Sequence, residues 1–560
     1  MKSKRHNFLY SFDVANIQEG VLKLFLALSI LLFVVYPLFC ILKNSVWIDG
    51  GISFKEYQHI LKDNSRLVYN SLFTAVLSAA ISTVWSIFLS IRVVSLTGLR
   101  KKLLILLLAM SMVSPPFIAS LTYIQLYGRR GMITHDILHL SYNPYNEWGI
   151  IAMQSIHFVS LSTLFLIAYL EKMDRRLIDA SRDLGASIWN TYKRVVLPMM
   201  FPAAGVAFIL SFIRSISDFG TPAVIGGRYD TLASAIYMQL IGYGKMEYAA
   251  AMNMLLLIPA IISFIVYRIF MVKSGRTAEV EGFQSAGTMH MPSPGGTFGI
   301  ITGLFSLIYI IMMLLQYGCI FVTGFLKSRK GVYYFSLEHF DNLFQYNIKS
   351  LSLSLEIALV VSLLGSIFGL LLSYYLVRKR MPLGGFFDFM ATLPYLLPGT
   401  CFGIGYILAF NHEPLKLTGT VFIIAINMLF KQLPAVLRIG SVAILQISER
   451  IEEAARDLGA RRINVVWQIV FPNLGNAFVT SFLYNFAGCM TTAGAVIFLI
   501  SAKYKIAVYT LFDAINSGEY GVAALISSII ILLTLIVAGI AYGINRFLEK
   551  SISSTGGKSK

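Results

Sequence analysis

Ionisable side chains inside apolar stretches are the residues of this sequence most able to do chemistry. Arg214 and Asp218 lie four residues apart, so on one helix they can pair with each other. Charged groups at membrane depth are costly and mark substrate or ion pathways. Asp218 can therefore gate a pathway or hold a cationic group, and Arg214 can contact an anion. The alternative is an internal ion pair that stabilises the helix bundle.

His157 and Lys431 form a second polar level, at equivalent places in two halves of the chain. They either face each other across a pathway, or each hydrogen-bonds a neighbouring helix. No set of His, Tyr or carboxylate residues has clear metal-ligand spacing, so we predict no metal site. None of the four cysteines belongs to a CxxC pair, and we interpret all four as small core residues.

The elements that must position these residues are strongly apolar. Of the 560 residues, 56% are hydrophobic and only 13% are charged, about half the charged fraction of soluble domains. The net charge of +18 is explained by basic residues in cytoplasmic loops, without nucleic acid as a partner. We therefore expect an all-α integral membrane protein in contact with lipid.

Apolar stretches of about 20 residues each predict about twelve transmembrane helices, since backbone groups in lipid must be satisfied within the segment. The bias of Lys and Arg between loops predicts cytoplasmic N- and C-termini. Pro115, Pro116, Pro394 and Pro398 are expected to kink two of the spans. The predicted spans are 21–42, 67–94, 103–127, 149–170, 200–225, 248–271, 298–325, 350–377, 384–410, 418–437, 473–500 and 520–545.

A polar stretch rich in Gly, Ser and Pro divides the spans into two groups of six and reads as a linker. Both groups run from inside to inside, so the halves are parallel repeats with pseudo-symmetry about the membrane normal. The expected organisation is a cytoplasmic tail (1–20), a first transmembrane domain (21–271), a cytoplasmic linker (272–297), a second transmembrane domain (298–547) and a cytoplasmic tail (548–560).

A charged insert recurs between the fourth and fifth span of each half, at 171–198 and 445–472; we call these the first and second insert. Asp183-Leu184-Gly185-Ala186 recurs as Asp457-Leu458-Gly459-Ala460 without a gap. A short helix with a smooth alanine face, ended by glycine, suits a groove on another protein. The alternative is a helix that lies on the lipid headgroups. Duplication at the same place in both halves favours docking.

The inserts resemble the cytoplasmic signature of ABC importer permeases: E-A-A, three residues, G, nine residues, I-x-L-P. Both copies match its spacing, with conservative replacements. The second copy consists of Glu453, Ala454, Ala455, Gly459, Ile469, Phe471 and Pro472, and the first of Asp179, Ala180, Ser181, Gly185, Val195, Leu197 and Pro198.

This resemblance implies that each insert docks into one of two ABC ATPase subunits. It also implies an extracytoplasmic solute-binding protein and a multi-pass location in a prokaryotic inner membrane. A P-loop is not found, because Ile552 stands where the first glycine before Gly557-Lys558-Ser559 is needed. We therefore expect a non-enzymatic permease that binds no cofactor, with ATP and Mg²⁺ on the separate ATPase.

The fused layout, with SDFGTPAVIGG in the fifth span, resembles ferric-iron importer permeases, so the resemblance implies iron as the solute. Related permeases handle 2-aminoethylphosphonate, hexose phosphates, thiamine or polyamines, and these solutes remain alternatives. An ion-coupled secondary transporter should lack the duplicated insert and carry buried coupling carboxylates. A membrane enzyme would need clustered His, Asp or Ser at one face, but the histidines are scattered.

Overall fold

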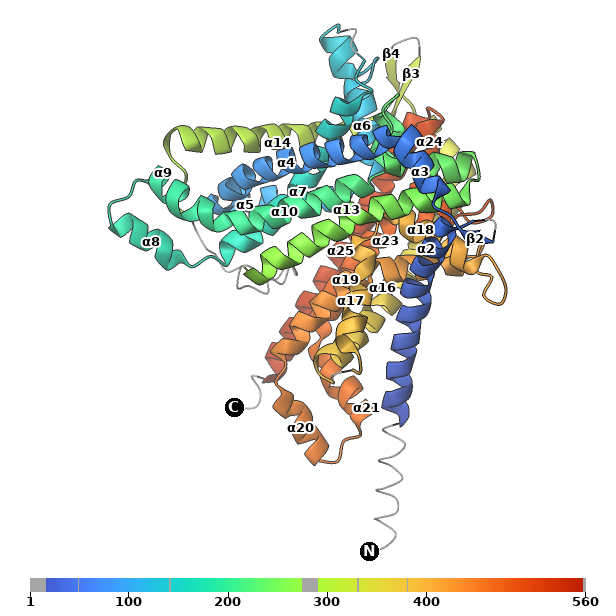
Figure 1. Ribbon diagram of the computed structural model, residues 1–560. Coiled ribbons are helices and arrows are strands. Elements are labelled where there is room, and N and C mark those ends of the chain that lie inside the picture. The colour runs from blue at the N-terminus through green and yellow to red at the C-terminus, as the bar shows by residue number, and fades with distance from the viewer. Residues whose placement is uncertain are drawn as a thin grey trace, which may run out of the picture.

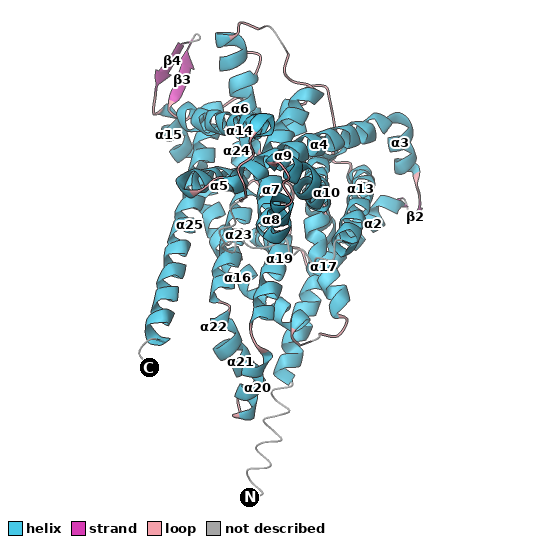
Figure 2. Ribbon diagram, turned by 90° about the vertical axis from the view of Figure 1, so that its left-hand side faces the viewer, coloured by secondary structure: helices cyan, strands magenta, loops and turns pink. Residues whose placement is uncertain are grey.

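The computed structural model describes residues 17–48, 50–140, 143–273, 291–329, 332–379 and 381–556. Within these ranges helices dominate, and strands occur only in two short antiparallel hairpins (Figure 2). The hairpins are formed by β1 (Trp47–Ile48) with β2 (Gly51–Ile52) and by β3 (Leu326–Arg329) with β4 (Val332–Phe335). The predicted all-α membrane architecture is confirmed.

Nine helices in the described ranges are long and apolar enough to cross a bilayer, or eleven if each of two bent helix pairs is one span. The bent pairs turn by 105° between α5 (Gly98–Val113) and α6 (Phe117–Tyr127) and by 111° between α17 (Gly384–Leu396) and α18 (Gly399–Phe410). Both turns coincide with the prolines expected to kink these spans, because proline removes a donor and clashes with the preceding turn.

The predicted span at 473–500 is wrong in its extent. The helix there, α23 (Gly475–Thr491), has only 17 residues. It is preceded by the three-residue α22 and a turn at Leu474, and it ends where the backbone of Thr492 becomes extended. The equivalent first-half segment, Ile188–Ser217, is a helical run of 30 residues.

The first half consists of the following elements. They are a helical segment at Ile17–Val46 that includes α2 (Tyr36–Val46), then α3 (Lys55–Asp63), α4 (Ser65–Ser95), α5 (Gly98–Val113), α6 (Phe117–Tyr127), a π-helical turn at Met132–Ile137, α7 (Glu147–Glu171), α8 (Arg175–Asp183), α9 (Ile188–Thr191), a π-helical turn at Tyr192–Val196, α10 (Leu197–Ser217), α11 (Gly220–Ile225), α12 (Leu232–Tyr237), a π-helical turn at Met238–Gly242 and α13 (Met246–Lys273).

The second half follows in the same order. Its elements are α14 (Gly296–Thr323), α15 (Glu338–Asn342), a π-helical turn at Leu343–Asn347, α16 (Ile348–Val377), α17 (Gly384–Leu396), α18 (Gly399–Phe410), α19 (Val421–Gln446), α20 (Glu449–Asp457), α21 (Arg462–Val465), a π-helical turn at Val466–Val470, α22 (Phe471–Asn473), α23, a 3₁₀ turn at Val496–Phe498, α24 (Ala507–Asn516) and α25 (Tyr520–Gly556). Most of the predicted linker and of the N-terminal tail lies outside the described residues.

Each half has a three-helix core built from equivalent elements. In the first half α4 packs against α7 and α10, and in the second half α16 packs against α19 and α23. In the apolar 18-residue stretch of the central helix α7, 72% is buried within the protein. The corresponding share for the peripheral helix α14 is 28%. Because α14 is also the more apolar of the two, with a mean hydropathy of 2.4 against 1.8, its exposed surface is suited to lipid.

The first helix of each half packs on the other half. The segment Ile17–Val46 lies against α18, where the Tyr406 hydroxyl donates to the Phe33 carbonyl at 2.8 Å. Helix α14 lies against α4, where the Trp85 indole donates to the Phe305 carbonyl at 3.1 Å. The first helix of each half thus joins the two halves through partly buried hydrogen bonds.

The two halves meet at one end and diverge toward the other (Figure 1). Contacts between halves join α6 to α24 and α18 to both α12 and α13. Away from this junction, the first half extends toward α8 and the second toward α20, so that the two inserts occupy separate far ends (Figure 1). The helical segment before α2 and the end of α25 extend toward the same end as α20 (Figure 1).

Candidate functional site

The two inserts form the same local structure. Helices α8 and α20 are each nine residues long, and each ends in the same backbone hydrogen-bond pattern. Ala186 N–H donates to Ser181 C=O at 3.1 Å, and Ala460 N–H donates to Ala455 C=O at 3.0 Å. Such a bond over five residues is the mark of a helix ended by a left-handed residue.

Gly185 and Gly459 supply that left-handed residue, with φ of +82° and +88°. A Cβ added at either glycine would meet no atom within 4 Å. Glycine is therefore needed here for its backbone conformation and not for close packing. The open space around both glycines leaves room for a partner backbone.

The exposed surfaces of the inserts also match. Leu184 and Leu458, directly before the glycines, are 88% and 90% exposed. Around them lie exposed residues of the predicted coupling set: Asp179, Ala180, Gly185 and Pro198 in the first insert, and Glu453, Ala454, Gly459 and Pro472 in the second. Ser181 and Ala455 are half-buried at the same position.

Asp218 does not form the predicted ion pair with Arg214. Because α10 ends one residue before Asp218, the two side chains no longer share a helical face. Asp218 Oδ1 instead accepts from the N–H groups of Gly220 and Thr221 at 3.0 and 3.2 Å, and Oδ2 accepts from Gln154 Nε2 at 3.0 Å. The carboxylate thus orders the break between α10 and α11.

Lys431 and His157 do not contact each other in the described structure, although their positions are equivalent. Lys431 Nζ donates to the carbonyls of Pro394 and Leu397 at 2.6 and 2.8 Å. These carbonyls lie at the break between α17 and α18, where helical donors are missing. His157 is half-buried, and its ring packs edge-on against Phe158.

Five aromatic side chains meet at the junction between the halves, and we call them the aromatic cluster. Contacting rings have centroids 4.8 to 6.4 Å apart. The first half contributes three rings and the second contributes two. The members are Phe117, Phe219, Tyr237, Phe498 and Phe512.

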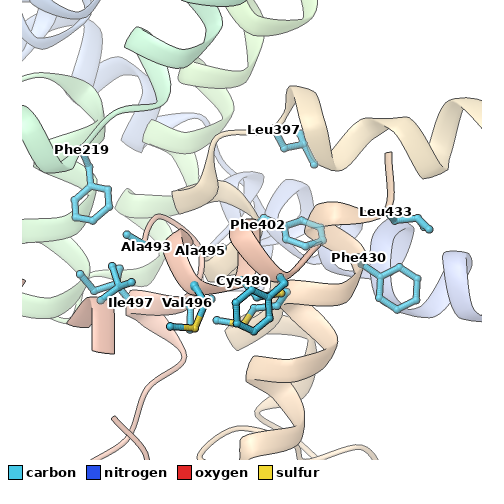
Figure 3. Packing of buried hydrophobic residues seen from close by; sticks show 14 of the residues in the cluster. Phe219, Leu397, Phe402, Phe430, Leu433, Cys489, Ala493, Ala495, Val496 and Ile497 are labelled. Atoms are coloured by element: carbon cyan, nitrogen blue, oxygen red, sulfur yellow. The ribbon is translucent and has the colours of Figure 1, made fainter. Parts of the chain in front are cut away.

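Three rings of the cluster follow breaks in helices: Phe117 after the α5–α6 break, Phe219 at the α10–α11 break and Phe498 after α23. Figure 3 shows Phe219 directed from the first half toward Ala493 and Ile497 of the second. Irregular backbone at membrane depth is tolerated only where protein buries it or where it lines a cavity. The cluster therefore buries irregular backbone of both halves at their junction.

Glycines let the broken segments approach closely in both halves. A Cβ on Gly220 would lie 2.5 Å from the ring of Phe117, and a Cβ on Gly399 would lie 2.8 Å from the backbone of Gly494. In each half, the start of the second bent helix thus packs directly on the break that follows α10 or α23. The breaks form one packed layer with the aromatic cluster.

The aromatic cluster was not predicted from the sequence, because it is assembled from five separate elements. The available signal was an aromatic residue directly after Pro116 and after Asp218. Glu452, which is buried on the inner face of α20, was not predicted either. Among the described residues, no group of three or more His, Cys, Asp and Glu could hold a metal ion.

A comparison with protein families finds the same family in both halves of the chain. The model of the family "Binding-protein-dependent transport system inner membrane component" matches residues 99–273 and again 362–554. The chain belongs to this family. Each match contains one insert, which identifies an ABC importer permease of the fused two-half type and thus a multi-pass inner-membrane protein.

Two ferric transport permeases are similar to this protein over most of its length. The ferric transport system permease protein FbpB of Actinobacillus pleuropneumoniae is 29% identical over 528 residues, which is 91% of this chain and 76% of that protein. The putative ferric transport system permease protein FbpB 1 of Haemophilus influenzae is 29% identical over 86% of this chain and 77% of its own length. The sulfate transport system permease protein CysT of Escherichia coli is 27% identical over 44% of this chain and 90% of its own length.

Proposed function

We propose that this permease moves ferric iron into the cytoplasm, powered by two copies of a separate ABC ATPase. The matched geometry of the inserts supports the ATPase role, because two equal surfaces suit two equal partners. The similarity to ferric transport permeases over 91% of the chain supports iron. An extracytoplasmic binding protein delivers the solute.

Each insert seats one ATPase subunit, with its exposed leucine and the open side of its glycine in the contact. Both inserts, the start of the first helix and the end of α25 then face the cytoplasm. The permease contributes no catalytic residue, and ATP and Mg²⁺ bind the ATPase. Closure of the ATPase pair on ATP draws the two inserts together.

The described conformation corresponds to a pathway closed on the outer side. The halves meet at the aromatic cluster and diverge toward the inserts (Figure 1). Drawing the inserts together rotates the halves about this junction and separates the rings. Asp218 and Lys431 hold the broken helices that carry this layer, while Arg214 and His157 remain the candidates for direct contact with the solute.

Uptake of radiolabelled ferric iron tests this proposal, measured under iron starvation in cells with and without the permease. We expect the uptake to be lost with the protein and to be unaffected by excess 2-aminoethylphosphonate or hexose phosphate. Copurification of the ATPase with the permease tests the partner separately. Unchanged iron uptake together with a bound ATPase would leave a permease and move its solute to the phosphorylated or aminated compounds, including thiamine and polyamines.

The family match favours the ABC permease over the ion-coupled transporter that the sequence alone had left open, and the same two measurements test this directly. An ion-coupled transporter would copurify without an ATPase, and its uptake would respond to proton or sodium gradients.

A further inference from the structure

The two inserts differ at one buried position. Ile178 in α8 and Glu452 in α20 occupy equivalent places on the inner face, and both are 2% exposed. A buried isoleucine needs only apolar neighbours, whereas a buried carboxylate must be paired or hydrogen-bonded. The second insert is therefore attached to its half by different chemistry from the first.

Glu452 binds three side chains at the end of α16. Its Oε2 accepts a hydrogen bond from the Tyr374 hydroxyl at 2.9 Å and lies 3.4 Å from Lys379 Nζ. Its Oε1 lies 3.2 Å from Arg378 Nε. All of these partners belong to α16 or to the two residues after it, so the carboxylate joins α20 directly to that helix.

Arg378 extends the contact to a third helix. Its NH2 group donates to the carbonyl of Ile444 at 2.9 Å and also to that of Ile447, at the end of α19. Its NH1 group lies 2.9 Å from Glu449, at the start of α20. One guanidinium thus gathers the ends of α16 and α19 and the start of the insert helix.

The charge pair at the centre of this network is only partly hydrogen-bonded. Arg378 Nε and Glu452 Oε1 lie within ion-pair distance, but neither atom has a hydrogen bond of acceptable geometry. Buried polar networks gain most when every member is satisfied. A small shift of α20 against α16 could complete this bond, so the network has room for a second arrangement.

We propose that Glu452 is a positioning residue that transmits movement of the second insert to α16 and α19. The proposal rests on the proposed docking of ATPase subunits to the inserts. The first insert carries Ile178 at this place, so its helix α8 has no ionic contact with its half at the equivalent position. The second insert is thereby the more rigidly connected of the two.

The test measures movement and ATP hydrolysis separately in the complete complex of permease, ATPase and binding protein. Spin labels at Leu445→Cys and Phe201→Cys report the distance between the two halves, in a background whose four native cysteines are replaced by alanine. Both positions are exposed, on α19 and α10. This readout does not depend on the identity of the solute.

In Glu452→Gln we expect the ATP-driven shift in distance to fall by about half or more, while ATP hydrolysis stays within about twofold of the unchanged protein. Tyr374→Phe, which removes one hydrogen bond from the same carboxylate, should give a smaller loss. The control is Asp388→Asn, which removes the 3.3 Å ion pair with Arg438 between α17 and α19, outside both inserts. It should lower thermal stability without changing the shift per assembled complex.

A shift in Glu452→Gln equal to that of the unchanged protein, or a loss equal to that of the control, overturns the proposal. If Glu452→Gln does not assemble, the double variant Glu452→Ile with Arg378→Met replaces the charges by apolar groups, a change that buried ion pairs often tolerate. The proposal expects this variant to assemble and to show a shift reduced by about half or more, as in Glu452→Gln, and a normal shift in it overturns the proposal. Failure of the unchanged permease to bind an ATPase would instead reject the proposed function.

Discussion

The first and second inserts share their outward surface and differ in their inward attachment. Outwardly, both present a leucine about nine-tenths exposed before a glycine with φ above +80°. Inwardly, the first insert rests on Ile178, and the second on a carboxylate held by Tyr374, Arg378 and Lys379. The similar outward surfaces are what two equal partners would require, and the different inward contacts are what each half requires. The proposed docking would keep the surfaces alike and leave the attachment free to diverge.

The glycine substitutions give the largest expected effect on this comparison. Gly185→Val and Gly459→Val each force a β-branched residue into a left-handed conformation, at a cost of roughly 1–2 kcal/mol or more. We expect each to weaken ATPase binding strongly, and the double variant to abolish uptake. Copurification of the ATPase and uptake of ferric iron are the measurements.

Gly419→Val is the matched control for these variants. Gly419 has φ of +81° and equally open surroundings, but it lies in the loop before α19, outside both inserts. It should carry a similar conformational cost and retain its ATPase. Normal uptake in the double glycine variant would show that the inserts do not dock.

The exposed leucines give the next effect. Leu184→Asp and Leu458→Asp each remove an apolar side chain that docking would bury, which is worth about 1.5–3 kcal/mol. Each change should therefore weaken ATPase binding by roughly 10- to 100-fold, and the two should be equal if the docked surfaces are equivalent. Titration of the ATPase onto purified permease measures both values, with Leu415→Asp, on the opposite side of the second half, as the unaffected control.

Local features of this fold could be predicted from the sequence, because they depend on neighbours in the chain. The glycine-ended insert helices and the proline-bent spans each follow from a few adjacent residues. The partner of Asp218 was not predictable, since it depended on α10 ending one residue earlier. The contact of Glu452 with Arg378 joins residues more than seventy positions apart, and spacing along a single sequence carries no signal for it.

The third-largest expected effect concerns the aromatic cluster, where the two halves join. Phe512→Ala removes a ring that contacts Phe117, Phe219 and Tyr237. Loss of a buried phenylalanine costs about 3–5 kcal/mol, so thermal stability should fall. If the rings close the pathway, the ATPase bound to this variant should also hydrolyse ATP without the binding protein, because the closed state is no longer favoured.

Phe305→Ala is the control for ring removal. Phe305 stacks on Phe88 at 4.8 Å, between α14 and α4, away from the aromatic cluster. It should lower stability without releasing ATP hydrolysis from its dependence on the binding protein. Equal ATP hydrolysis in the two variants would assign the rings of the cluster to packing alone.

The smallest effect concerns the equivalent pair His157 and Lys431. Lys431→Met leaves the carbonyls of Pro394 and Leu397 without their donor, which costs about 1–3 kcal/mol when the acceptors are buried. His157→Leu should cost less, because the described contact of that ring is packing against Phe158. Thermal unfolding in detergent measures both changes. A larger loss for His157→Leu would mean that the first half also supports its bent helix through this position, and the two halves would then be more alike at the breaks than at the inserts.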